Sequence, residues 1–416
     1  MSRSSIVCTL VAGLASAARA QEPALLQLLP EAKRMAVPDW VKAGMRATYY
    51  IGVGTHAGDY LYLTGERKHD VQDYTIEGRQ GHFVLKKGGV EGSGHGYLEV
   101  NVAAAEPAAA ALETRYLILM GVGTADPPKF SGVTGGVPAS GACDWWIHPQ
   151  ALELLVARGD AKRGIHAGRV KYRQEDREIP AVYFAAEGSL YTWEAATGLL
   201  LYRSEGAASP GKERLQMPDG SILDGSGGTK CFYYLRGLRQ VDLPWREAGM
   251  PKWLATTKSI TYEGENSLKQ PGFAPTTITV SATHEFAGGG TNWIRTKLTL
   301  GQGGGLGGAQ QAPPAVERVF GPGTTSGLWI APESLAALRA GQQIDAQDRW
   351  SHASIVVTHA GPRDGRDVVV ITEQSPLFRI DCHYDKRSGG LVRWVLTEPQ
   401  VGEMYTEVDL RLTGTR

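Results

Sequence analysis

The sequence predicts a mainly β protein of the α+β class, built from two tandem duplicated domains that each fold as an antiparallel, curled sheet with a short covering helix. Three pairs of similar segments, which recur in the same order along the chain, predict this duplication. They are PDWVKAGMRATY at 38–49 and PKWLATTKSITY at 251–262, WIHPQAL at 146–152 and WIAPESL at 329–335, and WEAATGLLLYR at 193–203 and YDKRSGGLVRW at 384–394. One match alone is weak, but three matches in the same order are typical of an internal repeat.

The shift between the paired segments varies along the chain, so the two copies differ by insertions. The first copy is predicted at 38–241 and the second at 251–414, joined by a linker at 242–250. The chain of 416 residues has room for two such domains, each large enough to bury a core without metals or crosslinks.

Each copy is predicted to follow the same order of elements. A short helix begins at Pro149 and at Pro332, because proline fits the first helical turn, and it continues over 150–158 and 333–339. β-Branched and aromatic runs separated by turn residues then predict antiparallel strands. The predicted strands are 170–172, 179–185, 190–194, 199–202 and 230–241 in the first copy, and 353–358, 368–372, 377–385, 391–396 and 404–412 in the second.

The third pair of segments predicts a β-hairpin in each copy. Glu194 or Asp385 ends one strand, Gly198 or Gly389 lies in the turn, and an apolar run begins the returning strand. Glycine adopts positive φ without strain, so we expect positive φ at Gly198 or its neighbour.

Two low-complexity stretches precede the helices. An alanine-rich stretch covers 103–111, and a stretch rich in Gly, Gln and Pro covers 301–314. Such compositions bury little apolar surface. We therefore expect both as mobile surface loops.

The N-terminus has the pattern of a cleaved secretory signal at 1–20. Arg3 precedes an apolar run, and Ala18 and Ala20 are small residues at the positions that signal peptidase reads. The alternative is a membrane anchor, but the run is shorter than the ~20 residues that a spanning helix needs, and no later segment is long and apolar enough. We expect a secreted or periplasmic protein without a transmembrane segment after cleavage, which begins with the short segment 21–37.

The charge balance excludes a general affinity for polyanions. The chain has 43 basic and 43 acidic residues, and the predicted signal contains two of the arginines, so the mature formal charge is about −2. We expect no binding to nucleic acid or to an anionic membrane surface. Three cysteines remain after cleavage, Cys143, Cys231 and Cys382, so at most one internal disulfide forms, and the sequence leaves open whether any pair does.

The arrangement resembles the half-open barrels of periplasmic lipoprotein carriers of the LolA and RseB type. The matching residues are Trp40, 190–202 and 231–241 in the first copy, and Trp253, 377–394 and 404–412 in the second. The resemblance implies a sheet curled around an apolar groove with the helix as its lid, and a function in binding or sensing lipoprotein acyl chains. The chain departs from this family in its Gly- and Ala-rich insertions and in lacking a long N-terminal amphipathic helix beyond the short segment 23–35.

Tryptophans concentrate in and beside the repeated segments. If each sheet curls around a groove, the apolar stripes of the two helices cover it, together with rings from the repeats. The predicted groove residues are Trp146, Leu155, Trp193, Trp329, Leu338 and Trp394. The alternative for all six is ordinary core packing, which is the commoner role of tryptophan at such positions.

The sequence contains no nucleophile elbow, Walker A loop, zincin pair or Cys-x-x-Cys motif, and we predict no cofactor. Strand alternation places Asp381, His383 and Asp385 on one face, which makes them the best candidate metal ligands, although a solvated strand face is the commoner explanation. Ser93 and His95 are close in sequence but lack an acid to orient the ring, so a nucleophilic site is not expected there.

Three functions are compatible with the sequence. The first is a secreted or periplasmic binding protein that holds a hydrophobic, acyl- or lipid-like ligand or an extended polypeptide, with a lipoprotein among its candidate partners. The second is a non-enzymatic structural or interaction protein of the envelope, with a protein partner. The third is an enzyme or metal site in one copy only. An apolar groove favours the first, a filled core the second, and converging charges in a cleft the third.

Overall fold

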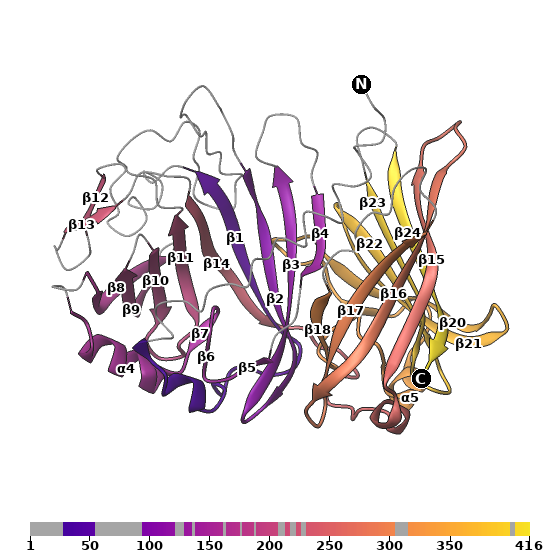
Figure 1. The fold of residues 1–416 in the computed structure, drawn as a ribbon, viewed down its shortest axis with the longest axis horizontal. Coiled ribbons are helices and arrows are strands. Elements are labelled where there is room, and N and C mark those ends of the chain that lie inside the picture. The colour runs from indigo at the N-terminus through magenta and orange to yellow at the C-terminus, as the bar shows by residue number, and fades with distance from the viewer. Residues whose placement is uncertain are drawn as a thin grey trace.

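Two large antiparallel sheets lie side by side in the computed structural model (Figure 1). The structure describes residues 28–54, 94–120, 129–134, 138–160, 164–174, 177–186, 189–206, 213–216, 222–225, 230–303, 315–399 and 404–416. The predicted signal at 1–20 and Ser93 lie outside these residues. No described helix is long and apolar enough to cross a membrane.

In the described part of the chain, the first sheet contains ten strands. Along the hydrogen-bonded path their order is β4, β3, β2, β1, β14, β11, β10, β9 and β8, and β5 also pairs with β3. The bounds are β1 Met45–Gly54, β2 Gly94–Glu106, β3 Ala109–Met120, β4 Lys129–Thr134, β5 Pro138–Ala139, β8 His166–Gln174, β9 Arg177–Ala186, β10 Ser189–Glu194, β11 Leu200–Gly206 and β14 Lys230–Gln240. Two small hairpins lie beside it, formed by β6 Ala142–Cys143 with β7 Trp146–Ile147, and by β12 Glu213–Gln216 with β13 Ile222–Gly225.

The second sheet also contains ten strands, in the order β18, β17, β16, β15, β24, β23, β22, β21, β20 and β19. The bounds are β15 Ser259–Lys269, β16 Thr276–Gly289, β17 Ile294–Gly303, β18 Val316–Phe320, β19 Gln343–Asp345, β20 Ser354–Arg363, β21 Arg366–Ser375, β22 Phe378–Asp385, β23 Leu391–Pro399 and β24 Tyr405–Thr415. Of the predicted Gly-rich loop, 301–303 belong to β17 and 304–314 lie outside the described residues.

The predicted fold class, with two sheet-rich halves, is confirmed. The two sheets have corresponding strand orders. Strands β1, β2 and β3 of the first sheet correspond to β15, β16 and β17 of the second. Strands β8, β9, β10, β11 and β14 correspond to β20, β21, β22, β23 and β24. Among the described residues, each half has one α-helix, α4 Pro149–Ala157 or α5 Pro332–Ala337, and each begins at the predicted proline. Two 3-10 helices, η1 Ala32–Arg34 and η3 Lys252–Thr256, precede the first strands of the two sheets. The domain limits 38–241 and 251–414 remain our proposal.

The repeated hairpin turn has the same contacts in both halves. The φ angle is 73° at Gly198 and 74° at Gly389, so the predicted positive φ is confirmed. Each glycine carbonyl accepts a hydrogen bond from an isoleucine that precedes the helix, Ile147 at 3.0 Å or Ile330 at 2.9 Å. A Cβ at either glycine would overlap the carbonyl oxygen of that isoleucine. Glycine is therefore required by the available space as well as by φ.

Aromatic side chains from the start of each half hold these hairpins in place. A tryptophan Nε1 donates to a carbonyl in the turn, and a tyrosine hydroxyl donates to a carbonyl in the returning strand. The four hydrogen bonds join Trp40 to Thr197, Trp253 to Ser388, Tyr49 to Leu200 and Tyr262 to Leu391, at 2.9, 2.8, 3.1 and 3.0 Å. The repeated segments thus share their sequence because they perform the same structural task twice.

The alanine-rich stretch is not a mobile loop, and that prediction was wrong. Residues 103–111 form the hairpin between β2 and β3. Its buried alanines pack against Trp293 and Val319 of the second half. The backbone of Gly323 comes so close that its N–H donates to the carbonyl of Ala103 at 2.6 Å. Small side chains are needed at this contact, so the low complexity here reflects close packing.

A buried cluster of ion pairs joins the two sheets. Glu373 of β21 pairs with Arg115 of β3 at 2.6 Å and with Arg46 of β1 at 3.1 Å. Arg115 also pairs with Glu113 at 2.7 Å, and Arg46 with Glu99 at 3.4 Å. All five side chains are buried. Because buried charges are tolerated only when they are paired, this cluster fixes the position of one half against the other.

The predicted linker at 242–250 also packs between the halves. Trp245 is fully buried in the second core, and its Nε1 donates to the carbonyl of Thr324 at 3.3 Å. At the end of β14, Arg239 pairs with Asp345 at 2.8 Å and with Asp348 at 2.9 Å. The two halves therefore share an interface that combines apolar packing with ion pairs.

Candidate functional site

Five of the six predicted groove residues are buried in the two cores. They are Trp146, Leu155 and Trp193 in the first core, and Trp329 and Leu338 in the second. In this structure the apolar stripes of α4 and α5 therefore rest on protein. Trp394 differs, because it lies on β23 and is partly exposed at the edge of the second core.

The interior of the first half is closed by an arginine among aromatic rings. The guanidinium of Arg203 lies 5.4–6.0 Å from the ring centroids of Trp145, Tyr191 and Tyr233. Arg203 and Trp394 occupy equivalent positions in the two sheets. Arg203 of β11 lies between β10 and β14, and Trp394 of β23 lies between the corresponding strands β22 and β24. Cation–π attraction stabilises this arrangement. This part of the first sheet therefore has a filled interior.

The inner face of the second sheet carries apolar side chains that are only partly buried. Val280 and Leu410 both pair with Gly264, and Leu410 also pairs with Trp394, so these residues form one row across four strands. Paired residues point to the same side of a sheet. We call the following set the apolar face: Leu268, Ile278, Val280, Leu300, Trp394, Val408, Leu410 and Leu412.

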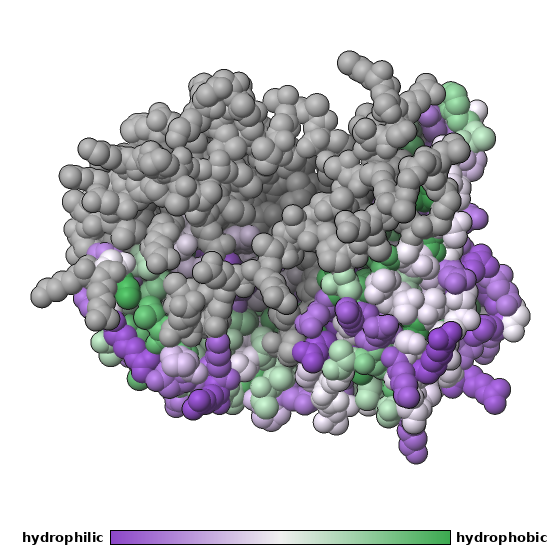
Figure 2. Space-filling view, in the orientation of Figure 1, coloured by the Kyte–Doolittle hydropathy of each residue, from purple (hydrophilic) through white to green (hydrophobic). Residues whose placement is uncertain are grey.

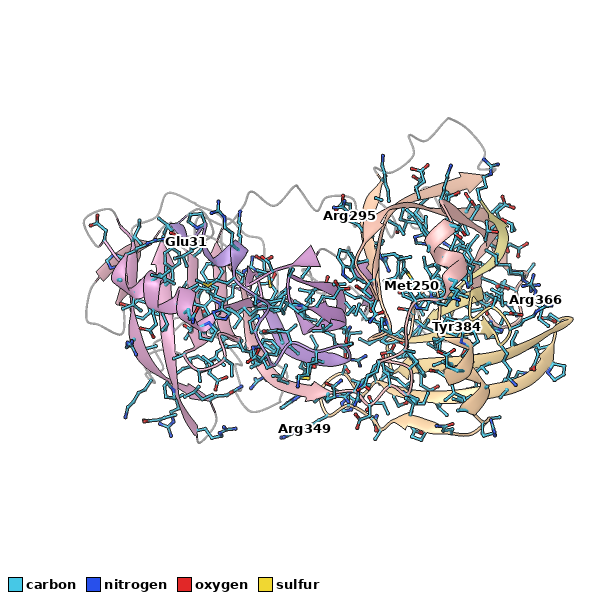
Figure 3. The ribbon with its side chains drawn as sticks, turned by 90° about the horizontal axis from the view of Figure 1, so that it is seen from below. Glu31, Met250, Arg295, Arg349, Arg366 and Tyr384 are labelled. Atoms are coloured by element: carbon cyan, nitrogen blue, oxygen red, sulfur yellow. The ribbon has the colours of Figure 1, made fainter. Side chains whose placement is uncertain are left out.

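A glycine and a bulge curve the sheet at this face. A Cβ at Gly264 would overlap the carbonyl oxygen of Asp409 on β24, and the register of β15 and β24 shifts between Thr261 and Tyr262. Glycine kinks and β-bulges are the features by which sheets curve. Figure 3 shows the strands of the second half curving, with Tyr384 inside the curve.

A buried carboxyl lies at the end of the apolar face. Glu398 of β23 pairs with Thr406 of β24, and this is the next inward-facing pair beyond Val408. Burial raises the pKa of Glu398 to about 7, against a smaller opposite effect of its hydrogen bond with Thr406. At the same end of the sheet, an open pocket of about 880 Å³ is lined in part by Phe378 and Tyr405. Glu398 thus changes its charge near neutral pH beside an apolar surface.

The strand face with Asp381, His383 and Asp385 does not bring these three side chains together as a group of metal ligands. Asp381 accepts hydrogen bonds from Arg379, and Asp385 accepts one from the N–H of Ser388 at 2.7 Å. Burial, followed by nearby arginines, lowers the pKa of His383 to about 4. Within the described ranges, no three His, Cys, Asp or Glu side chains are grouped so that they could hold a metal.

The cysteines of known geometry are free thiols, Cys143 half-buried and Cys382 buried. Cys143 and Cys382 form no disulfide, and burial raises the pKa of both thiols. A thiol in such surroundings is a poor nucleophile. The side chains of Cys231 and His95 lie outside the described part of the chain.

Sequence reasoning found one member of the apolar face, Trp394, because this residue belongs to a repeated segment. The other members were missed. The signal for them was the alternation of apolar residues at 278, 280 and 282 and at 408, 410 and 412. This period of two identifies one face of a strand but does not say whether that face is covered.

Comparisons with known proteins assign no family to the chain. No protein-family model matches it, and no curated protein matches it. Among solved structures, the chain is similar to the one described as "Crystal structure of MucB in complex with MucA(peri)". The TM-score is 0.16 and the sequence identity is 10%, and the match covers 94% of this chain and 92% of that chain. A TM-score this low does not establish a shared fold, so function has to be argued from the contacts within this chain.

Proposed function

We propose that this protein is a secreted or periplasmic binding protein that holds an acyl chain against the apolar face of its second half. The observation that carries the proposal is the row formed by Val280, Leu410 and Trp394, which remains partly exposed although it continues the second core. An apolar surface beside a core gains free energy when another apolar group covers it.

An alkyl chain suits this face better than an extended polypeptide. The strands β16, β15, β24 and β23 are paired on both sides, so they offer no free edge for an added strand. The side chains of the apolar face cannot satisfy the N–H and C=O groups of a bound peptide, and burying such groups without partners costs free energy. An alkyl chain has no such groups.

The expected affinity is modest. Covering about eight methylenes at ~0.8 kcal/mol each gives about 6 kcal/mol, which corresponds to a Kd on the order of tens of micromolar. A ligand held with this affinity exchanges readily, which suits a carrier or a sensor.

Titration with dansyl-undecanoic acid, followed by its fluorescence, tests the proposal. We expect saturable binding, and we expect Val280→Asp to weaken it at least tenfold, because a charge would enter the apolar face. Thr279→Asp is the matched control, since Thr279 is exposed on the opposite face of the same strand. Absence of saturable binding, or equal weakening by the two variants, would refute the proposal.

The second candidate is a structural or interaction protein of the envelope. It is favoured by the filled interior around Arg203 in the first half and by the buried ion pairs between the halves. These features make the first half a rigid support. A folded protein that binds no acyl probe but captures an envelope protein would favour this function.

A further inference from the structure

The tip of the β15–β16 hairpin displays an aromatic side chain to solvent. Phe273 is 69% exposed, and the other large apolar side chain that the described residues expose is Leu238, at 36%. All residues from 270 to 277 are exposed. This hairpin projects at the upper right of Figure 1, and Figure 2 shows hydrophobic surface at its end.

The turn holds Phe273 in a defined position. Its N–H donates to the carbonyl of Gln270 at 3.1 Å and closes a four-residue turn. Pro271 occupies the second position and Gly272, with φ of 80°, the third, which is the pattern of a type II turn. Proline and the hydrogen bond restrict this turn, so the ring is presented outward at the end of the hairpin.

The charge pattern of the hairpin is that of a segment that enters a lipid interface. No residue from 270 to 283 is charged. At the base of the tip, Lys269 pairs with Glu407 at 2.6 Å, and its ammonium lies 5.8 Å from the ring centroid of Tyr405. Proteins place apolar rings in the acyl region, and tyrosine and lysine one level further out, at the headgroups.

We propose that the β15–β16 hairpin docks on a lipid bilayer, with Phe273 inserted below the headgroups and Tyr405 and Lys269 at headgroup level. The apolar layer of the bilayer is the recognised partner. Lys269 is neutralised by Glu407, so residues 269–277 carry no unpaired cation that would select anionic lipid. Charge therefore contributes little to the interaction.

Docking at this tip would bring the apolar face to a source of acyl chains. Ile278 of β16 comes five residues after Phe273 in the turn, which corresponds to at most roughly 17 Å of extended chain. The inference nevertheless stands on the hairpin alone. It holds whether or not the apolar face binds a ligand.

Co-sedimentation of the full chain with phosphatidylcholine vesicles, prepared with and without phosphatidylglycerol, tests the inference. We expect binding to both kinds of vesicle at low and high salt. Phe273→Ser should lower the vesicle partition coefficient about tenfold, as expected for the loss of one buried ring. Leu238→Ser is the matched control and should leave it unchanged. Phe273→Trp should bind, with an emission that shifts to the blue and is quenched by brominated lipid.

Three results would overturn the inference. They are the absence of vesicle binding, an equal effect of Phe273→Ser and Leu238→Ser, and binding that needs phosphatidylglycerol and disappears at high salt. The dansyl-undecanoic acid titration contains no vesicles, so it reports on the apolar face separately. Loss of vesicle binding with intact probe binding refutes this inference alone, and the converse refutes the proposed acyl site alone.

Discussion

Removing the charge of Glu373 should lower the free energy of unfolding of the protein. Glu373 is the carboxylate that the second half contributes to the buried cluster, where it pairs with Arg115 and Arg46 of the first half. Glu373→Gln keeps the size of the side chain but ends both ion pairs, at 2.6 and 3.1 Å. It leaves two buried guanidinium groups with only the carboxylates of Glu99 and Glu113 as partners. Removing one partner of a buried ion pair typically costs about 3–5 kcal/mol.

The pKa of Glu373 gives a second route to the magnitude. Burial opposes ionisation, but Arg115 and Arg46 outweigh it and lower the pKa from 4.5 to about 2. A group whose pKa falls on folding contributes stability above its unfolded pKa and loses it as the pH falls towards the folded value. This shift corresponds to about 3 kcal/mol, present above about pH 4.5 and lost between about pH 4.5 and pH 2. The two routes agree.

Urea unfolding followed by circular dichroism at several pH values measures this effect. At pH 7 we expect Glu373→Gln to lower the free energy of unfolding by about 3 kcal/mol, a large part of the ~5–15 kcal/mol of a typical protein. The difference from the unmodified chain should shrink as the pH falls from about 4.5 towards 2, because Glu373 takes up a proton more readily in the unfolded chain than in the folded protein over this range. A loss under 1 kcal/mol at pH 7, or one that is constant with pH, would show that the cluster does not join the halves as described.

The remaining predictions concern the turn, the alanine hairpin and the end of the apolar face. Gly198→Val should destabilise by more than ~1 kcal/mol in thermal unfolding, through strain at positive φ and overlap with Ile147, whereas Gly249→Val, which meets nothing within 4 Å, should not. Ala104→Leu should cost about 1–3 kcal/mol by overpacking the contact between the halves, and the exposed Ala108→Leu should cost little; equal melting temperatures would contradict the close packing. Dansyl-undecanoic acid should bind more weakly as the pH rises through about 7, because Glu398 becomes charged, and Glu398→Gln should remove that dependence.

The helices and the strands that follow them were predictable because their signals are local, whereas β1 to β4 and β15 to β18, which precede the helices, were not predicted. Each predicted strand overlaps an observed one, and both helices begin at the predicted prolines. The hairpin at 103–111 was not predictable from composition. Alanine has little apolar surface, so its composition alone does not indicate burial. Here burial depends on the backbone at Gly323, which is more than 200 residues away in the sequence and donates a hydrogen bond to Ala103. The buried cluster around Glu373 was missed for the same reason, since charged residues in strands normally lie at the surface.

The two copies agree where the fold needs them to agree and differ where a ligand could be held. Gly198 and Gly389 make the same contacts because the turn tolerates no side chain. The position of Arg203 and Trp394 bears no such constraint, since it lies on the inner face between two paired strands. There the first copy closes its interior with a cation among rings, and the second presents an apolar ring to a partly open surface. A scaffold with no ligand would gain from closing both interiors, because each exposed apolar side chain forgoes the free energy of burial. The open second interior is therefore the part of the molecule where binding should be sought.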